Sequence, residues 1–212
     1  MAERGVRICA VSETLRKRIG GEPSVVVANG ITPSEWQPPW RAPAWFEALP
    51  RPRLLYVGAI HERLNTDALR ELSESLPEAS IVVVGPITSP NIVNKLYPLT
   101  NVYVHDPVPH SEVAGLIHAA DVCLMPHRRT ALTESMSPLK LYEYCAAGRP
   151  VVATDLPPVR NVNHRVRLVA EGESFSGAVK QALNDGPLAE KDRQDFLARN
   201  SWQRRHDEIL DL

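Results

Sequence analysis

Short apolar runs alternate with amphipathic segments along most of the chain after residue 52. The apolar runs occupy residues 54–57, 81–84, 102–104, 122–125, 151–153 and 166–169. Segments with helical periodicity separate most of them, at about 64–76, 90–97, 110–120, 138–147 and 173–185. Strands that are apolar on both faces and alternate with helices are typical of a parallel sheet covered on both sides. The pattern therefore predicts an α/β fold, a Rossmann-like doubly wound parallel sheet, followed by a polar helical tail.

Two shorter units precede this region. Residues 6–11 and 25–28 read as strands, and residues 13–19 read as a helix with Ser12 as its N-cap. One strand–helix–strand piece cannot bury both faces of its sheet, so we expect it to need neighbours. Residues 32–52 are rich in proline and contain three tryptophans, which indicates a stiff connector. These tryptophans either cover an interface with a partner or pack back onto their own domain.

Composition narrows the class of protein. The chain has 212 residues and a formal net charge of −1, which gives no reason to expect a nucleic-acid partner. No apolar run reaches the ~18 residues that a membrane span needs. Cys9, Cys123 and Cys145 stand singly, with neither the spacing of a disulfide framework nor that of a zinc site. We therefore expect no bound metal and a reducing, cytoplasmic setting.

The segment SPLKLYEYCAAGRP, residues 137–150, reads as a complete short helix. Ser137 is a candidate N-cap, Pro138 suits the first helical position, and Gly148 suits the C-terminal end. The free N–H groups at the helix start, beside Lys140, are a natural seat for phosphate. Glu143 shares a face with Lys140 and could accept hydrogen bonds from sugar hydroxyls next to that phosphate. Capped amphipathic helices are also common as purely structural elements, so both interpretations stand at this point.

The string SPLKLYEYCAAGRPVVATDLPPVR resembles the signature of the GT-B-fold retaining glycosyltransferases of group 1, also called family 4. Three further segments are similar to parts of these enzymes: residues 12–15 to the end of the N-terminal acceptor domain, residues 29–31 to the hinge, and Ser201-Trp202 to the closing helix. The resemblance implies three regions. Residues 1–31 are a remnant of the acceptor domain with the hinge, 32–52 a linker rich in proline and tryptophan, and 53–212 the nucleotide-sugar-binding domain.

The resemblance also implies a donor site. In the family, the glutamate that matches Glu143 binds the ribose of the donor nucleotide, and the helix start faces the diphosphate. The loop after the third strand of the sheet domain holds the base, largely through backbone groups. The expected donor-binding residues are Ser137, Pro138, Leu139, Lys140, Glu143, Gly58, Arg63, Asp106 and Val108.

The chain departs from the family pattern in two places. The E-x7-E pair of the family ends at Glu143 and would begin at Ser135, with Glu134 one residue away. The arginine that many members carry after the first-strand glycine is Ile60 here, so Lys140 becomes the first choice for phosphate, with Arg63, Arg128 or Arg129 behind it. No catalytic residue can be assigned.

The resemblance implies transfer of a sugar from a UDP- or GDP-linked donor to a saccharide, lipid or other small acceptor, with retention and without a metal or another cofactor. Polysaccharide biosynthesis, a cytoplasmic location and a membrane-peripheral full-length enzyme are further expectations. The isolated chain should be inactive because most of the acceptor domain is missing, and its exposed N-terminal remnant should favour a homodimer. Two alternatives remain open: a nucleotide-sugar epimerase of the same fold, and a non-catalytic nucleotide-sugar-binding module. Neither G-x-G-x-x-G, a Walker A loop nor G-x-S-x-G occurs.

Overall fold

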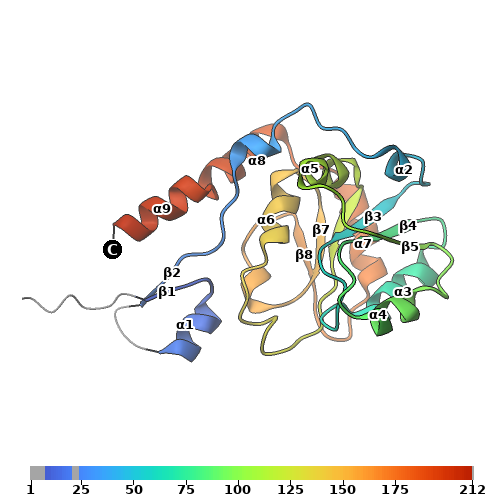
Figure 1. Ribbon diagram of the computed structural model, residues 1–212, viewed down its shortest axis with the longest axis horizontal. Helices are drawn as coiled ribbons and strands as arrows, with labels where there is room; N and C mark the ends of the chain where they lie inside the picture. Colours follow the sequence, from blue (N-terminus) through green and yellow to red (C-terminus); the bar gives the residue numbers. More distant parts are fainter. Residues whose placement is uncertain (1–7, 21–23, 212) are drawn as a thin grey trace, which may run out of the picture.

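The computed structural model describes residues 8–20 and 24–211 (Figure 1). The strands are β1 (Ile8–Ala10), β2 (Ser24–Val26), β3 (Arg53–Val57), β4 (Ser80–Val84), β5 (Val102–His105), β6 (Val122–Met125), β7 (Val151–Thr154) and β8 (Val166–Val169). The α-helices are α1 (Glu13–Ile19), α2 (Ala44–Glu47), α3 (Thr66–Ser75), α4 (Pro90–Leu96), α5 (His110–Ala119), α6 (Leu139–Ala146), α7 (Phe175–Asp185), α8 (Glu190–Arg199) and α9 (Trp202–Leu210). Short 3-10 turns, η1 and η2, lie at Pro33–Trp36 and Pro157–Val159.

Six of the strands form one parallel sheet with the order β5-β4-β3-β6-β7-β8. The strand order reverses between β3 and β6, which is the topological switch point where α/β sheets bind ligands. All six strands lie at the predicted apolar runs, and every residue of β4 is buried. The predicted doubly wound parallel sheet is therefore confirmed.

The sheet has a separate hydrophobic core on each face, because successive side chains of a strand point to opposite sides. On one face, Leu55, Val82 and Met125 pack with residues of α5, α6 and α8. On the other face, Tyr56 and Val83 pack with residues of α3, α4 and α7. Figure 1 shows the sheet running between these two groups of helices. Helices on both faces leave the carboxyl ends of the strands as the natural place for a ligand.

The connector packs back onto the sheet domain. Trp36 is buried, the Trp40 ring stacks on His118 with centroids 3.8 Å apart, and the Trp45 ring stacks on His105 at 3.9 Å. A Cβ added to Gly115 in α5 would lie 2.0 Å from the carbonyl oxygen of Arg41. The glycine is thus what lets the connector backbone approach α5. Of the two roles left open for the tryptophans, the structure shows packing onto their own domain.

The N-terminal unit is a two-stranded parallel ribbon, β1 with β2, joined by α1. Ser12 caps α1 as predicted, because its Oγ accepts a hydrogen bond from the N–H of Leu15 at 3.1 Å. The first two residues of the predicted strand 6–11 lie outside the described residues. The Ser12 hydroxyl also donates to the carbonyl of Ser135, which ties this unit to the loop before α6.

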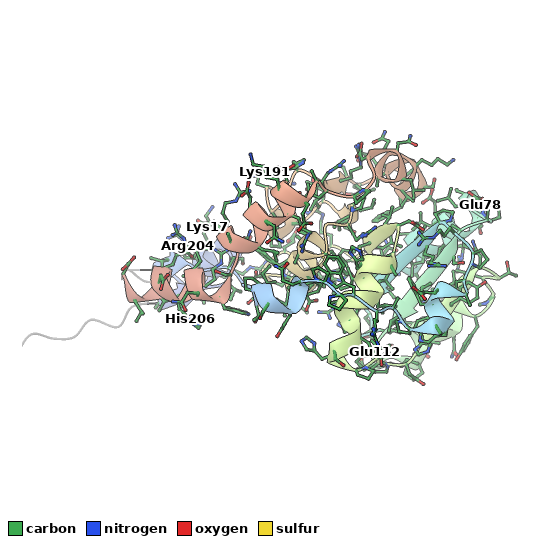
Figure 2. All side chains as sticks on the ribbon, turned by 90° about the horizontal axis from the view of Figure 1, so that it is seen from above. Lys17, Glu78, Glu112, Lys191, Arg204 and His206 are labelled. Atoms are coloured by element: carbon green, nitrogen blue, oxygen red, sulfur yellow. The ribbon has the colours of Figure 1, made fainter. Side chains whose placement is uncertain are left out.

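The helical tail and the N-terminal unit lie at the same end of the molecule. Figure 2 shows α9, which carries Arg204 and His206, at the same end as Lys17 of α1, with Glu78 at the opposite end. The hinge segment is held on α8 and α9: Ile31 forms a parallel bridge with Ser201. No helix among the described residues is long and apolar enough to span a membrane.

Candidate functional site

A pocket of about 390 Å³ opens at the carboxyl edge of the sheet, beside the switch point. This volume lies within the ~300–1,000 Å³ range of small-molecule sites. Its residues come from the hinge, the end of β3 with the loop after it, the start of α5, the loop after β6 and the start of α6. They are Asn29, Val57, Gly58, Arg63, His110, Val113, His127, Met136, Ser137, Pro138, Leu139, Lys140 and Glu143.

The end of β3 is fixed to α6 through a buried tyrosine. The N–H of Val57 donates to the Tyr144 hydroxyl at 2.8 Å. The next residue, Gly58, has φ = +142°, and a Cβ added there would lie 2.4 Å from Lys140 Nζ. Only glycine adopts this backbone without strain and leaves room for the ammonium group. The strand end and the helix start therefore form one surface.

The start of α6 differs from the prediction by one residue. The helix begins at Leu139 with Pro138 at the N-cap, so Ser137 is not the cap. The Ser137 hydroxyl instead accepts a hydrogen bond from the Asn29 N–H at 3.1 Å, and the Ser137 carbonyl accepts one from the Asn29 amide at 2.6 Å. Ser137 therefore binds Asn29 of the hinge segment, although its local sequence predicts that it caps the helix. The first amides of α6 have no intrahelical carbonyl partner and keep their partial positive charge. The predicted C-terminal glycine, Gly148, does adopt φ = +70°.

Lys140 is half-buried as a residue, but its ammonium group is enclosed. The Nζ atom lies 3.9 Å from the centroid of the Tyr56 ring and has no hydrogen-bond partner among the described residues. Burial, and then the charge of Arg63, lowers the pKa of Lys140 to about 7. Such an amine, held over an aromatic face with no ion pair or hydrogen bond among the described residues, is suited to meet an anion that enters the pocket.

Glu143 lies one turn further along the same helix face. Burial raises the pKa of its carboxyl, while the nearby charges of His110 and Lys140 act in the opposite direction. Glu143 is the carboxylate that lines this pocket, whereas Arg63 and Lys140 line it as cations. One carboxylate and two cations suit a ligand that carries both hydroxyl groups and phosphate.

Seven of the nine predicted donor-binding residues line this pocket, and Asp106 and Val108 do not. Both residues lie in the segment between β5, an edge strand of the sheet, and α5, and the start of α5, at His110 and Val113, is the part of this region that lines the pocket. Sequence reasoning did not identify His127, Asn29 or His110 as lining residues. His127 follows β6 after one proline, at the ligand-binding edge, and that position was the available signal.

Arg128, Arg129 and Glu134 do not line this pocket. Arg129 pairs with Glu134 at 3.0 Å, and Arg128 lies 3.4 Å from Asp67. Both arginines line a second, larger cavity of about 840 Å³ near the starts of α3 and α7. Asp67, Glu71, Glu171 and Glu173 also line that cavity, so its charge does not favour a diphosphate. The smaller pocket at α6 is therefore the candidate donor site despite its size.

Comparison with known proteins identifies the family to which the chain belongs. Residues 51–185 match the family described as glycosyl transferases, group 1. TuaH of Bacillus subtilis (strain 168), a protein named for a glycosyltransferase of teichuronic acid biosynthesis, is 32% identical over 104 residues, which are 48% of this chain and 26% of TuaH.

Solved structures share the fold at low sequence identity. Sucrose-phosphate synthase from Thermosynechococcus elongatus superposes with a TM-score of 0.76 at 19% identity, over 96% of this chain and 56% of that one. Anabaena HepE, solved in complex with UDP, gives 0.70 at 15% identity, over 96% of this chain and 62% of HepE.

A parallel α/β sheet with helices on both faces and a pocket at its switch point defines a doubly wound, Rossmann-like class of fold, and here it has the architecture of GT-B glycosyltransferases. The family match covers more than half of the chain. The chain belongs to the group 1 glycosyltransferases. It spans about a quarter of TuaH and a little over half of the structural neighbours named above.

Proposed function

We propose that this chain carries the donor site of a retaining glycosyltransferase and binds a UDP- or GDP-linked sugar in the α6 pocket. The observation that carries the proposal is the joint placement of Lys140 and Glu143 on one face at the start of α6, opening into a pocket beside Gly58. Anabaena HepE, which shares the fold, was solved with UDP and with UDP-glucose, which supports a nucleotide-sugar ligand.

Each group has a separate task in this proposal. The Lys140 ammonium and the first amides of α6 neutralise the diphosphate, with Arg63 as a further cation. The Glu143 carboxylate accepts hydrogen bonds from the ribose hydroxyls. Gly58 lets the diphosphate approach the strand end closely. Positive charge from the protein fills the role that a metal would have, so the proposal includes no metal or other cofactor.

The whole protein would transfer the sugar to a saccharide, lipid or other small acceptor, as in polysaccharide biosynthesis. In this proposal residues 1–31 belong to the acceptor domain and hinge, 32–52 to a linker, and 53–212 to the donor domain. Catalysis of a two-substrate reaction depends on holding both substrates in alignment. The isolated chain should therefore bind the donor without transferring it. Transfer at ordinary enzyme rates by the purified chain would contradict this assignment.

Calorimetric titration of four ligands, uridine, UDP, guanosine and GDP, tests the donor site. Glu143→Gln should weaken both nucleosides and diphosphates by roughly 10- to 100-fold, because a charged hydrogen bond contributes ~1.5–3 kcal/mol. Lys140→Ala should weaken only the diphosphates. Glu134→Gln is the matched control, since Glu134 pairs with Arg129 outside the pocket. If the wild-type chain binds none of the four ligands, or if the control weakens binding as strongly as Glu143→Gln, the assignment is wrong.

A further inference from the structure

His127 is a buried histidine whose ring nitrogens are both unpaired. The residue is 1% exposed, and neither Nδ1 nor Nε2 has a hydrogen-bond partner among residues 8–20 and 24–211. Its backbone is fully engaged: the N–H donates to the Met125 carbonyl at 3.0 Å, and the Thr154 hydroxyl donates to the His127 carbonyl at 2.7 Å. The backbone contacts explain why the chain turns here. They do not require an imidazole.

Folding alone does not account for this side chain. A buried polar group without a partner destabilises the folded state, so an apolar ring of similar shape would serve the core better. Burial and the charges of Lys140, Arg63 and His61 lower the pKa of His127 to about 2. The ring is therefore neutral at physiological pH, with one N–H donor and one acceptor nitrogen.

The ring lies at a defined place along the donor pocket. His127 lines the α6 pocket together with Lys140 and Glu143, and it also lines the second cavity, which neither Lys140 nor Glu143 lines. The imidazole therefore lies where the α6 pocket borders that second cavity, and the Glu143 carboxylate lies away from this border. If the ribose is at Glu143 and the diphosphate at Lys140, the group beyond the diphosphate is the transferred sugar.

The neutral ring has one hydrogen-bond donor and one acceptor, and this pair matches sugar hydroxyls better than it matches phosphate oxygens. A diphosphate at neutral pH offers only hydrogen-bond acceptors, so it could satisfy the N–H of His127 but not its acceptor nitrogen. Sugar hydroxyls both donate and accept. We propose that His127 binds the hydroxyl groups of the transferred sugar, its N–H donating to one oxygen and its other nitrogen accepting from a neighbouring hydroxyl. This inference rests on the proposed donor site and names a residue of that site that determines specificity for the sugar.

The test compares sugar nucleotides with the bare diphosphates. Calorimetric titrations would use UDP, UDP-glucose, UDP-galactose, GDP and GDP-mannose with the wild type and with His127→Phe. The wild type should bind at least one sugar nucleotide about 5- to 30-fold more tightly than its diphosphate, the contribution expected of two neutral hydrogen bonds. His127→Phe should lose this increment and bind UDP and GDP as the wild type does.

Two further variants distinguish a role of His127 in sugar binding from a role in the stability of the fold. His127→Asn keeps one donor and one acceptor and should retain part of the increment. His118→Phe is the matched control: this histidine stacks on Trp40 outside the pocket and accepts from Arg149 at 3.2 Å, so its loss should lower stability without changing the increment. Ligand-free His127→Phe should melt at or above the wild-type temperature, because an unpaired polar ring is removed.

The inference is overturned if His127→Phe keeps the sugar increment, if it loses UDP and UDP-sugar affinity equally, or if it melts well below the wild type. A wild type that binds sugar nucleotides no more tightly than diphosphates also overturns it. If the wild type binds diphosphates normally in these cases, the donor site itself stands. Failure of the wild type to bind any nucleotide removes the donor site and this inference together.

Discussion

The affinity of the chain for UDP should fall steeply as the pH rises above 7. Lys140 is the cause: burial and the Arg63 charge lower its pKa to about 7, so the free protein loses this positive charge just above neutrality. The diphosphate attracts the protonated ammonium and raises its pKa on binding. UDP must therefore bind together with a proton at pH values above 7.

The size of the change in the Kd for UDP follows from the fraction of Lys140 that is protonated. With a pKa of about 7, roughly half of Lys140 is charged at pH 7 and about 3% at pH 8.5, so the Kd for UDP should rise about 15-fold over this window. The terminal phosphate of UDP has a pKa of about 6 and is already largely ionised at pH 7. Burial lowers the pKa values of His61 and His127 from the ordinary value, so these rings are neutral throughout.

Calorimetry provides the measurement and its internal check. Titrations at pH 8 in two buffers of different ionisation enthalpy should report an uptake of about 0.9 proton per UDP bound. Uridine, which has no phosphate, should show almost no dependence on pH. Lys140→Arg keeps its charge at all these pH values and should bind UDP with a nearly constant Kd. A constant Kd for the wild type, or the same slope in Lys140→Arg, would refute the role of this ammonium group.

Three further outcomes are expected. First, the stability of the ligand-free wild type relative to Lys140→Met should rise between about pH 7 and pH 10, by at most about 1.4 kcal/mol per pH unit. The reason is that Lys140 in the unfolded chain still holds the proton that it has lost in the folded chain. Denaturant melts at several pH values measure this rise in stability. Second, Gly58→Ala should lower stability by about 1–3 kcal/mol and also weaken UDP, since the strained backbone and the displaced Lys140 act together; unchanged UDP binding would argue against the pocket. Third, Gly115→Ala should destabilise the fold, because its Cβ would clash with the connector backbone. Gly177→Ala in α7 would meet only ordinary contacts and should be neutral or stabilising. Equal melting temperatures for the two variants would contradict the close approach of the connector backbone to α5.

Much of the fold was predictable because its signals are local. The apolar runs become the strands of the sheet domain, and Ser12 caps α1 and Gly148 ends α6 as their chemistry requires. Such signals act within a few residues and survive in almost any tertiary context. The rule that parallel sheets bind ligands at their carboxyl edge then placed Lys140 and Glu143 at one site.

Contacts between distant segments decided what remained. Asn29 takes the Ser137 hydroxyl and moves the helix start by one residue, a bond across 108 positions that no local pattern indicates. The unpaired ring of His127 and the lowered pKa of Lys140 likewise depend on the surrounding packing. Burial and electrostatic environment are properties of the assembled fold. The sequence by itself thus determined the strands and helices and the placement of Lys140 and Glu143 at one site. The tertiary structure decided the pKa of Lys140 and left the His127 ring without a partner within that site.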